Sequence, residues 1–411
     1  MSQIVPFKAL RPWRELAKQV AACPYDVVSL EEAREIVHNK HLSFLRVEKS
    51  EVDVPTYPEG NVYGMARMNL HDLLEKGILF QERKECLYIY RQQMGSHVQT
   101  GIVAGASVEE YESGKIKRHE LTRTDKETDR IKHITMVNAQ TGPVFLTYKS
   151  RLALDRIVER IASATTPEYD FVADDGVAHT VWIVSEENDI RAVQAEFAKV
   201  DTLYIADGHH RAAAAAAVAK TRRTRAPKCQ GDEPYNHIMA VIFPHDQLRI
   251  MDYNRAVRDL NGLDVAGFLQ KATGRFRVEE HFAEKSPRRP HEFGMYLDGR
   301  WFKLSVRESA TCGNDPLKSL DVSILQDHLL EPVLGIRDPR TDRRIEFIGG
   351  VRGMGELERL VDSGGFAVAF SLYPTSLDQL MTVADQGRVM PPKSTWFEPK
   401  LLSGLFVYPL E

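Results

Sequence analysis

The chain lacks the marks of a secreted or membrane-spanning protein. Its 411 residues include four cysteines, Cys23, Cys86, Cys229 and Cys312, and none forms a Cys-x-x-Cys pair. This spacing excludes a zinc knuckle or a redox dithiol and favours separate free thiols in a reducing compartment. The longest run of small or apolar residues, 212–219, has eight residues, against the ~20 that cross a bilayer.

The chain also has no excess of one charge sign. Its 54 Lys and Arg and 58 Asp and Glu residues give a net charge of −4, which argues against a protein that coats nucleic acid or an anionic membrane. Residues 1–8 contain no basic segment followed by an apolar core, so we expect no signal peptide and a cytoplasmic location. No period of 20–50 residues repeats, which excludes solenoids and propellers.

What is present is a mixture of helix and strand patterns in a chain long enough for two or three domains. We expect an α+β protein with one domain over residues 1–253 and a second α+β domain over 254–411. In the first half, the patterns predict a helix over 30–37 with Ser29 as N-cap, strands at 86–91 and 102–106, and a helix over 146–162.

The pattern is clearer in the second half. Strands are predicted at 179–184, 202–206 and 237–243, and helices are predicted after Ser185, as N-cap, and over 211–220. Asp298 and Gly299 predict a hairpin turn within 293–306, and helices are predicted over 322–330 and 377–386. The last helix has a capping-box pattern, Thr375 with Asp378, and Gly387 at its far end.

The stretch 203–211 carries the chemistry, because a strand there feeds a glycine turn that opens an alanine-rich helix. The free N–H groups at a helix start form an anion site. Gly208 lets a phosphate approach the backbone, and Arg211 adds a fork of donors. His209 and His210 can donate to a phosphate, while Asp207 can hold Mg²⁺ or take a proton from a hydroxyl.

Two plainer interpretations of this turn stay open. In the first, Asp207 serves simply as the N-cap of the helix, and His209 and His210 are polar surface residues. A metal site of these three residues is the other alternative, although adjacent histidines point in different directions on a helix. A basic run follows the helix and is typical of a solvated loop rather than of a nucleic-acid site; it comprises Lys220, Arg222, Arg223, Arg225 and Lys228.

A second segment, 387–400, places polar side chains after a helix. Two prolines there stiffen the chain in front of Lys393, Ser394 and Thr395, and a lysine with two hydroxyls is a phosphate-binding set. As an isolated pattern this segment is also typical of a surface loop.

Taken together, these segments resemble a known group of enzymes. The Asp-Gly-His-His-Arg string at 207–211 resembles the phosphate-binding turn of the ParB/sulfiredoxin-like superfamily, and it is most similar to the free L-serine kinases. Those kinases also end in a Pro-Lys-Ser/Thr-Thr segment, here 392–395, and the order of elements over roughly 200–411 is the same. The resemblance therefore implies a ParB/sulfiredoxin-like core in the first domain, joined to an α+β domain that closes the site.

The whole chain also resembles a large bacterial family of unknown function that is described as SpoOJ/ParA/ParB/RepB-like. The strings that carry this second resemblance lie at 6–12, 24–27, 119–122, 125–130 and 142–143.

The resemblance to the kinases implies roles for the residues of the turn. Asp207 would be a catalytic acid or base, or would orient Mg²⁺ as a metal ligand. Gly208, His209, His210 and Arg211 would bind the nucleotide phosphate or the transferred phosphoryl group.

The resemblance also implies that Lys393, Ser394 and Thr395 close over the phosphate from the second domain. Tyr253 and Asn254 occupy the stretch where the kinases carry an aromatic residue near the substrate, although Tyr253 is equally consistent with a core residue.

The sequence departs from the kinases at the general base. The kinases place a catalytic Glu after a proline upstream of the turn, whereas here the match at 11–15 is loose and the interval before the turn is far longer. Glu120 and Glu51 are the candidates, and an ordinary surface carboxylate is the alternative for each.

The function that we expect is a nucleotide-dependent phosphotransferase with Mg²⁺ and ATP or ADP as donor. Its acceptor would be a small hydroxylated metabolite, with free L-serine as the first candidate and O-phosphoserine as the product. The alternatives are a non-catalytic nucleotide-binding regulatory protein and a ParB-like DNA-partition protein. We expect no membrane partner and no nucleic acid; a homo-oligomer stays open.

Overall fold

The computed structural model describes residues 2–54, 61–225, 231–307 and 315–411, so Cys229, Cys312 and Lys228 lie outside the described residues. The chain forms two compact units. Unit 1 consists of Met1–Arg118, Thr122–Leu248 and Pro399–Glu411, and unit 2 of His119–Leu121 and Arg249–Glu398. The change of unit at 248/249 lies close to the predicted boundary at 253/254, but the C-terminal segment returns to the first unit.

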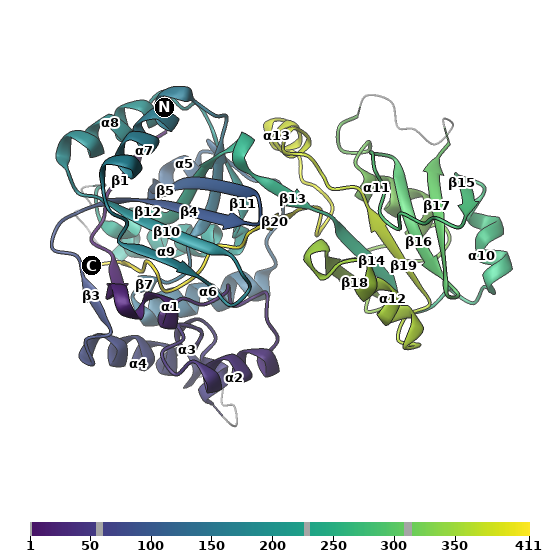
Figure 1. Ribbon diagram of the computed structural model, residues 1–411, viewed down its shortest axis with the longest axis horizontal. Helices are drawn as coiled ribbons and strands as arrows, with labels where there is room; N and C mark the ends of the chain where they lie inside the picture. The colour runs from purple at the N-terminus through teal and green to yellow at the C-terminus, as the bar shows by residue number, and fades with distance from the viewer. Residues whose placement is uncertain (1, 55–60, 226–230, 308–314) are drawn as a thin grey trace. The chain divides into compact units, whose positions relative to one another are not determined.

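Unit 1 is built on a nine-stranded mixed sheet (Figure 1). Eight strands follow one another in the order β6 (Ile116–Lys117), β11 (Leu203–Asp207), β8 (Val144–Tyr148), β12 (His237–Pro244), β5 (His97–Ser107), β4 (Leu87–Met94), β10 (Ala178–Val184) and β9 (Tyr169–Val172), and β1 (Ile4–Val5) also pairs with β5. The pairs β12–β8 and β11–β6 are parallel, whereas the other pairs of this sheet are antiparallel. The predicted α+β class is confirmed.

The sheet corrects one predicted helix. The predicted helix over 146–162 begins instead with strand β8, and helix α7 follows only from Leu152. The run Val-Phe-Leu-Thr-Tyr is buried throughout between β11 and β12, and its β-branched and aromatic residues suit a central strand. A short apolar run does not by itself distinguish such a strand from a buried helix.

Helices surround the sheet of unit 1, with α7 and α8 side by side and α6 beside α9 (Figure 1). Their bounds are α1 (Ala17–Val20), α2 (Leu30–Asn39), α3 (Leu45–Glu48), α4 (Asn61–Glu75), α5 (Val108–Glu112), α6 (Thr124–Val137), α7 (Leu152–Ala164), α8 (Glu187–Phe197) and α9 (His209–Arg225), with 3₁₀ turns η1 (Arg14–Leu16), η2 (Ser50–Asp53), η3 (Pro234–Asn236) and η4 (His245–Gln247).

The predicted cap of α2 is confirmed, because Ser29 and Glu32 form a complete capping box. The predicted cap at Ser185 is wrong: α8 begins at Glu187, and its N-cap, Glu186, makes no side-chain cap bond.

The C-terminal segment pairs with short strands of unit 1 that lie outside the nine-stranded sheet. Val407 exchanges backbone hydrogen bonds with Leu10, and β21 (Tyr408–Pro409) pairs with β7 (Ala139–Gln140), while β2 (Leu10–Pro12) pairs with β3 (Leu79–Gln81). Gly404 has φ +84°, and a Cβ there would lie 2.6 Å from Phe44 Cβ. Only glycine fits this close approach without a shift of the backbone.

Unit 2 contains a six-stranded antiparallel sheet. Its strands follow the order β15 (Phe276–Glu280), β17 (Arg300–Val306), β16 (Glu292–Leu297), β19 (Val368–Leu372), β14 (Tyr253–Val257) and β18 (Ile345–Gly349), and β13 (Arg249–Met251) pairs separately with β20 (Trp396–Glu398). The predicted hairpin is confirmed, with Leu297 opposite Arg300 and positive φ at Asp298 and Gly299.

The helices of unit 2 are α10 (Val265–Ala272), α11 (Asp321–Leu325), α12 (Met354–Asp362) and α13 (Leu377–Asp385), with the 3₁₀ turn η7 (Gly350–Arg352). The predicted helix over 322–330 divides into α11 and a π-helical turn, η6 (Gln326–Leu330). The capping box of α13 uses Ser376 and Gln379 rather than Thr375 and Asp378, because the Thr375 hydroxyl donates to the Ser394 carbonyl instead.

Two further expectations concern the whole chain. Cys23 and Cys86 are free thiols, as predicted. Within the described ranges, no helix has the length and apolarity needed to cross a membrane.

We predict that Gly404→Ala destabilises unit 1 more than Gly114→Ala does. Both glycines have positive φ, but a Cβ at Gly114 meets no atom within 4 Å. The strained backbone costs each variant about 1–2 kcal/mol, and the overlap with Phe44 adds about 1–3 kcal/mol at Gly404. Denaturant unfolding measures the difference, and equal losses in the two variants would contradict the tight approach at Phe44.

Asp321, the first residue of α11, is a buried carboxyl of unit 2, 8% exposed. Its Oδ1 accepts from the His291 N–H at 2.9 Å, and Oδ2 has no hydrogen-bond partner among the described residues. Burial raises the pKa of Asp321 to about 7, against the smaller opposing effect of the His291 N–H. The folded protein therefore keeps a proton that the unfolded chain releases.

This difference predicts a pH dependence of stability. As pH rises from about 4 to about 7, Asp321 should lower the free energy of unfolding by up to about 1.4 kcal/mol per pH unit. Asp321→Asn should lose that dependence and be the more stable protein at pH 8. Thermal unfolding of the variant relative to wild type tests this, with exposed Asp327→Asn as control; parallel pH profiles for wild type and Asp321→Asn would refute it.

Candidate functional site

The candidate site of unit 1 is the predicted strand–turn–helix. Strand β11 ends at Asp207, helix α9 begins at His209, and Gly208 between them has φ +90°. A Cβ at Gly208 would lie 3.1 Å from Arg211 Nε, so glycine is needed both for the backbone angle and for the folded-back arginine. The first backbone N–H groups of α9 are thereby presented next to the Asp207 carboxylate.

The alanines of α9 explain how closely the helix packs against the sheet. Five of them, at positions 212, 213, 215, 216 and 219, belong to the main hydrophobic core of unit 1 together with residues of β8, β11 and β12. Alanine has the highest helix propensity and the shortest side chain that still packs. The helix can therefore lie close to the sheet and hold its N-terminus fixed at the end of β11.

Two cations hold the Asp207 carboxylate. Oδ2 accepts from Lys400 Nζ at 3.1 Å and lies 3.9 Å from Arg211 Nη2, while Oδ1 accepts from the Gly208 N–H at 2.8 Å. Burial alone would raise the pKa of Asp207, but the charges of Lys400 and Arg211 outweigh it and hold the pKa well below its ordinary value. Asp207 is therefore ionised at neutral pH, with its side chain still 32% exposed.

The role of Lys400 was missed by the sequence reasoning. Lys400 follows β20 on the segment that returns to unit 1. Its carbonyl accepts from Gln92 Nε2 at 2.8 Å, and the fully buried Gln92 accepts in turn from Gln99 at 2.9 Å. No local pattern signals this contact, because Asp207 and Lys400 are 193 residues apart in the chain.

Arg211 is folded back over the turn rather than extended into solvent. Its Nη1 donates to the Pro143 carbonyl, and its side chain is only 11% exposed. Burial lowers the pKa of a guanidinium, but Asp207 and other nearby acidic groups together outweigh this, so the net shift of the Arg211 pKa is upward. Asp207 and Arg211, which were predicted separately as site residues, thus interact at the start of the helix.

A small cavity of about 20 Å³ lies behind Arg211, which is room for one water molecule. Glu48, Arg130 and His133 line it together with Arg211. The buried Glu48 has an Oε1 without a hydrogen-bond partner among the described residues, and Arg130 Nη2 pairs with Asp129 at 2.7 Å. Charged and polar side chains therefore lie around the same small cavity as Arg211, together with the apolar Ile134.

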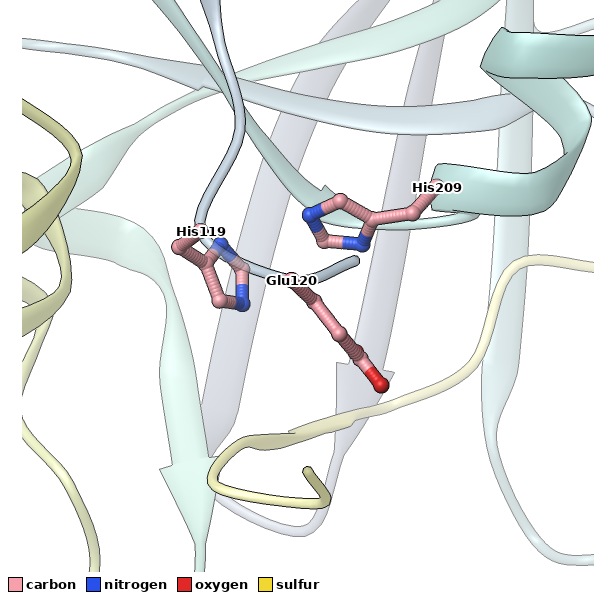
Figure 2. A group of neighbouring side chains, drawn as sticks. All are labelled: His119, Glu120 and His209. Atoms are coloured by element: carbon pink, nitrogen blue, oxygen red, sulfur yellow. The ribbon is translucent and has the colours of Figure 1, made fainter. Parts of the chain in front are cut away.

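The two histidines of the turn differ in their surroundings. His209 extends from the first turn of α9 (Figure 2) and is 5% exposed. His210 Nε2 accepts a hydrogen bond from the Arg123 N–H at 3.0 Å. A ring nitrogen that accepts carries no proton, so the neutral His210 bears its proton on Nδ1.

The candidate bases lie in different parts of the chain. Glu51 is on η2 in unit 1. Glu120 is a half-buried side chain of the loop after β6 (Figure 2), in the short segment that belongs to unit 2. Beside it in sequence, His119 contacts Thr395 Oγ1 through Nε2 at 3.3 Å. The general-base role of either glutamate stays a prediction.

The predicted residues of unit 2 are mostly held by local bonds. Asn254 is fully buried and binds Asp252 Oδ2 at 2.5 Å and the Leu372 N–H at 3.0 Å. Ser394 Oγ donates to the Pro391 carbonyl at 2.6 Å. Tyr253 is 7% exposed and its ring contacts Trp396 edge-on at 5.0 Å. Among the candidates of unit 2 named here, only Lys393 has an exposed side chain.

The charges around Asp207 do not fit a magnesium ligand. Mg²⁺ prefers oxygen donors in an octahedral shell, but both oxygens of Asp207 already accept from N–H donors, and two of its neighbours are cations. An alternative site with His210 meets the same difficulty, because His210 Nε2 already accepts the Arg123 N–H. The arrangement suits an incoming anion rather than a cation.

The basic run at the end of α9 has structural partners. Arg222 donates to the Leu410 carbonyl and to Asn138 Oδ1, and Arg223 pairs with Glu112 at 2.9 Å and donates to Asn236. These two arginines thus fix α9 within its own unit. Their presence in the basic run is explained by this structural role and does not require a nucleic-acid partner.

The chain matches one family model and is distantly similar to several solved structures. The family model described as "Protein of unknown function (DUF1015)" matches residues 4–323, whereas no curated protein matches. A solved free serine kinase in complex with AMP is 16% identical, with 72% of this chain and 86% of that chain covered and a TM-score of 0.36.

Two other solved structures are similarly distant. SbnI with C-terminal truncation from Staphylococcus aureus is 11% identical over 73% of this chain and 85% of that chain, with a TM-score of 0.38. A conserved hypothetical protein from Pyrococcus furiosus is 15% identical over 73% and 92%, with a TM-score of 0.35. Scores this low do not place individual residues of one chain on another.

We predict that Lys400→Met destabilises unit 1 by about 1–2 kcal/mol at pH 7, because it leaves a partly buried carboxylate without its nearest cation. A folded-state pKa that is held low stabilises the fold above the unfolded pKa of Asp, about 3.9, and this stabilisation is lost as pH falls. The difference in stability between Lys400→Met and wild type should therefore become smaller below pH 4.

The double variant Asp207→Asn/Lys400→Met supplies the control for this prediction. If Asp207 and Lys400 interact, the double variant loses less stability than the sum of the losses in the two single variants. Lys199→Met, at an exposed lysine paired with Glu196, should change little. Strictly additive losses for Asp207 and Lys400 would show that the contact contributes nothing.

Proposed function

The chain belongs to the family of proteins of unknown function DUF1015, and we propose that it is a nucleotide-dependent phosphotransferase that acts on a small hydroxylated metabolite. The observation that carries the proposal is the ionised Asp207, held between Lys400 and Arg211 where a glycine turn opens α9. A carboxylate, two cations and a helix N-terminus are the parts that phosphoryl transfer uses to orient an acceptor and stabilise phosphate charge.

The cations and the helix start support binding of the donor phosphate. The N–H groups and the positive dipole end of α9 favour an anion, and Arg211 and Lys400 add charge-assisted donors. Gly208 has no side chain, so the Arg211 guanidinium can lie directly against the turn. Arg211 is already fixed by Pro143 and Asp207, so little side-chain freedom remains to be lost when a phosphate binds.

The state of Asp207 indicates what the carboxylate can do. A carboxylate whose pKa lies well below the ordinary range is a weak general base at neutral pH. It remains a strong hydrogen-bond acceptor, so we assign it the orientation of the acceptor hydroxyl toward the phosphoryl group. In phosphoryl transfer such positioning supplies much of the catalysis, because the transition state requires little covalent chemistry from the protein.

The finer identity of the reactants rests on the Asp-Gly-His-His-Arg and Pro-Lys-Ser-Thr strings that the chain shares with free L-serine kinases. Free L-serine is accordingly the proposed acceptor and O-phosphoserine the product. ATP or ADP is the proposed donor. Mg²⁺ would have to be held by the nucleotide phosphates, because the surroundings of Asp207 favour anions.

A nucleotide-binding protein without catalysis is the second candidate. The observation in its favour is that Asp207, His210 and Arg211 all have internal partners, so the turn is complete as a binding platform. Nucleotide binding without any phosphorylated product would select this candidate. A DNA-partition role is less well supported, since Arg222 and Arg223 are engaged within unit 1.

We predict that Asp207→Asn lowers turnover about 100-fold or more while the fold is retained, because asparagine preserves the shape but loses the negative charge. The assay is transfer of label from ATP or ADP to a panel of amino acids and other hydroxyl compounds. The matched control is Asp201→Asn, at an exposed aspartate that precedes the same strand.

Three outcomes decide the proposal. Labelled product with wild type and with Asp201→Asn, but not with Asp207→Asn, supports it. Equal turnover in Asp207→Asn and wild type would remove Asp207 from the mechanism. Nucleotide binding with no labelled product across the panel would replace the phosphotransferase with the binding protein.

A further inference from the structure

The small cavity behind Arg211 contains a carboxylate oxygen that the proposed function does not use. Glu48, the last residue of α3, is 3% exposed, and its Oε1 is buried without a hydrogen-bond partner among the described residues. Such an acceptor costs stability, because its hydration is lost and nothing replaces it. Buried polar atoms that have no protein partner are commonly satisfied by an ordered water molecule.

The cations at the cavity do not bind this oxygen directly. Arg130 Nη1 lies 3.6 Å from the other oxygen, Glu48 Oε2, and the Arg130 guanidinium donates instead to Asp129, from Nε at 2.8 Å and from Nη2 at 2.7 Å. Over the described ranges, Glu48 forms no direct ion pair with Arg211. His133 also lines the cavity but is not a further cation, because burial lowers its pKa to about 4.

Gly142 leaves space between Glu48 and Arg211. A Cβ at this position would lie 3.4 Å from Glu48 Oε1 and 3.5 Å from Arg211 Cδ, so the two side chains border the same small volume. The cavity of about 20 Å³ has room for one water molecule. Burial lowers the pKa of Arg211, and Glu48 is one of the acidic groups that, with Asp207 as the largest, reverse this shift.

A water molecule fits the chemistry of this space better than an ion does. Water donates to a carboxylate and accepts from a guanidinium, so one molecule can satisfy Glu48 Oε1 and also bind Arg211. The bond to the Pro143 carbonyl uses one N–H of Arg211, and the guanidinium has others. A metal cation would face the guanidinium groups of Arg130 and Arg211, whereas an anion would face the Glu48 carboxylate.

The cavity also brings together three strings to which the proposed function gives no role. The string 125–130 contributes Arg130, and the string 142–143 supplies both the glycine that lines the cavity and the carbonyl that accepts from Arg211. The string 24–27 contributes a tyrosine whose ring centre is 4.1 Å from the Arg130 guanidinium carbon. All three strings belong to unit 1, so the surroundings of Arg211 are built within one unit.

The backbone that carries Glu48 is held by residues that line the same cavity. Arg130 Nη1 donates to the Glu48 carbonyl at 3.4 Å, and His133 Nε2 donates to the Val47 carbonyl at 2.8 Å. A side chain on a backbone fixed in this way can hold its neighbour in one geometry.

From this geometry we infer that the cavity binds one ordered water molecule and that Glu48 is a positioning residue, which holds the Arg211 guanidinium in place through that water. The inference rests on the proposed function, in which Arg211 binds the donor phosphate. Glu48 does not itself touch the reactants. Without it, Arg211 keeps only its contacts with Pro143 and Asp207, and its guanidinium has more freedom to lose when a phosphate binds.

Crystal structures of the full chain test the water directly and do not depend on activity. In wild type, a water should lie within hydrogen-bond distance of Glu48 Oε1 and of a guanidinium nitrogen of Arg211. Gly142→Ala should lack this water, because the added methyl group takes its space at ordinary contact distances and without a positive φ. Wild-type crystals without the water would overturn the inference.

Titration calorimetry with ADP tests the positioning role. Gly142→Ala and Glu48→Met should bind ADP about tenfold more weakly than wild type, which is the effect of one lost hydrogen bond. Glu48→Gln should stay within about threefold of wild type, because its amide oxygen still accepts from the water. In a turnover assay, the KM for the donor should rise in the first two variants and the KM for the acceptor should not.

Two controls separate positioning from stability. Glu110 of α5 is 8% exposed, pairs with Lys115 at 2.6 Å, and likewise has a buried oxygen, Oε2, without a hydrogen-bond partner in the described segments. Glu110→Gln should therefore lose stability but bind ADP like wild type. Gly355→Ala, where a Cβ meets no atom within 4 Å, should also bind like wild type.

The outcomes distinguish this inference from the proposed function. Wild-type ADP affinity in Gly142→Ala would overturn the positioning role alone, and this variant decides the question if Glu48→Met does not fold, since it removes no charged group. Failure of wild type to bind ADP would remove the proposed function and the positioning role with it.

Discussion

The arrangement of unit 1 depends on one ionic contact, that of Asp207 with Lys400 and Arg211. It joins the end of strand β11, the start of the alanine helix and the C-terminal segment at one point. Each partner is fixed elsewhere: Arg211 by the Pro143 carbonyl, Lys400 through its own carbonyl by the buried Gln92. The carboxylate is ionised because these cations outweigh its desolvation, and the turn therefore presents fixed charges rather than mobile ones. Fixed charges need little reorganisation when a ligand arrives, and for this reason the contact can serve both the fold and a reaction.

Much of this arrangement was predictable from local sequence, and the parts that were not share a physical cause. The Asp-Gly turn, the alanine helix, the Ser29 cap and the Asp298-Gly299 hairpin follow from the preferences of a few adjacent residues. The predicted helix over 146–162 wrongly includes the last three residues of β8, because an isolated apolar run does not reveal that strands flank it on both sides. The N-cap of α13 is Ser376 rather than the predicted Thr375, because the Thr375 hydroxyl donates a hydrogen bond to the Ser394 carbonyl, nineteen residues further along the chain. In each failure a contact distant in sequence overrode a local preference.

In the candidate site, too, the local pattern was predictable from the sequence and the long-range contacts were not. The string 207–211 identified the turn, but Lys400 has no local signal, because its role exists only once the C-terminal segment has returned to the first unit. Glu48 and Arg130 behind Arg211 were likewise missed, since buried polar residues on α3 and α6 resemble surface residues when read singly. The expected Mg²⁺ role of Asp207 came from the resemblance and from the residue type alone. It fits poorly because the sign of the neighbouring charges is a property of the folded arrangement.

Arg211 and Arg255 together show how burial of a cation is resolved in two ways within one chain. Arg211 is buried beside a carboxylate, and the net shift of its pKa is upward. Arg255 is buried beside carbonyls and rings, and its pKa is shifted downward. The first guanidinium is already neutralised, so an added anion must compete with Asp207 for it. The second has only backbone carbonyls as printed hydrogen-bond partners among the described residues, so no carboxylate would compete for it. For equal geometry, an oxyanion therefore gains more electrostatic free energy at Arg255 than at Arg211.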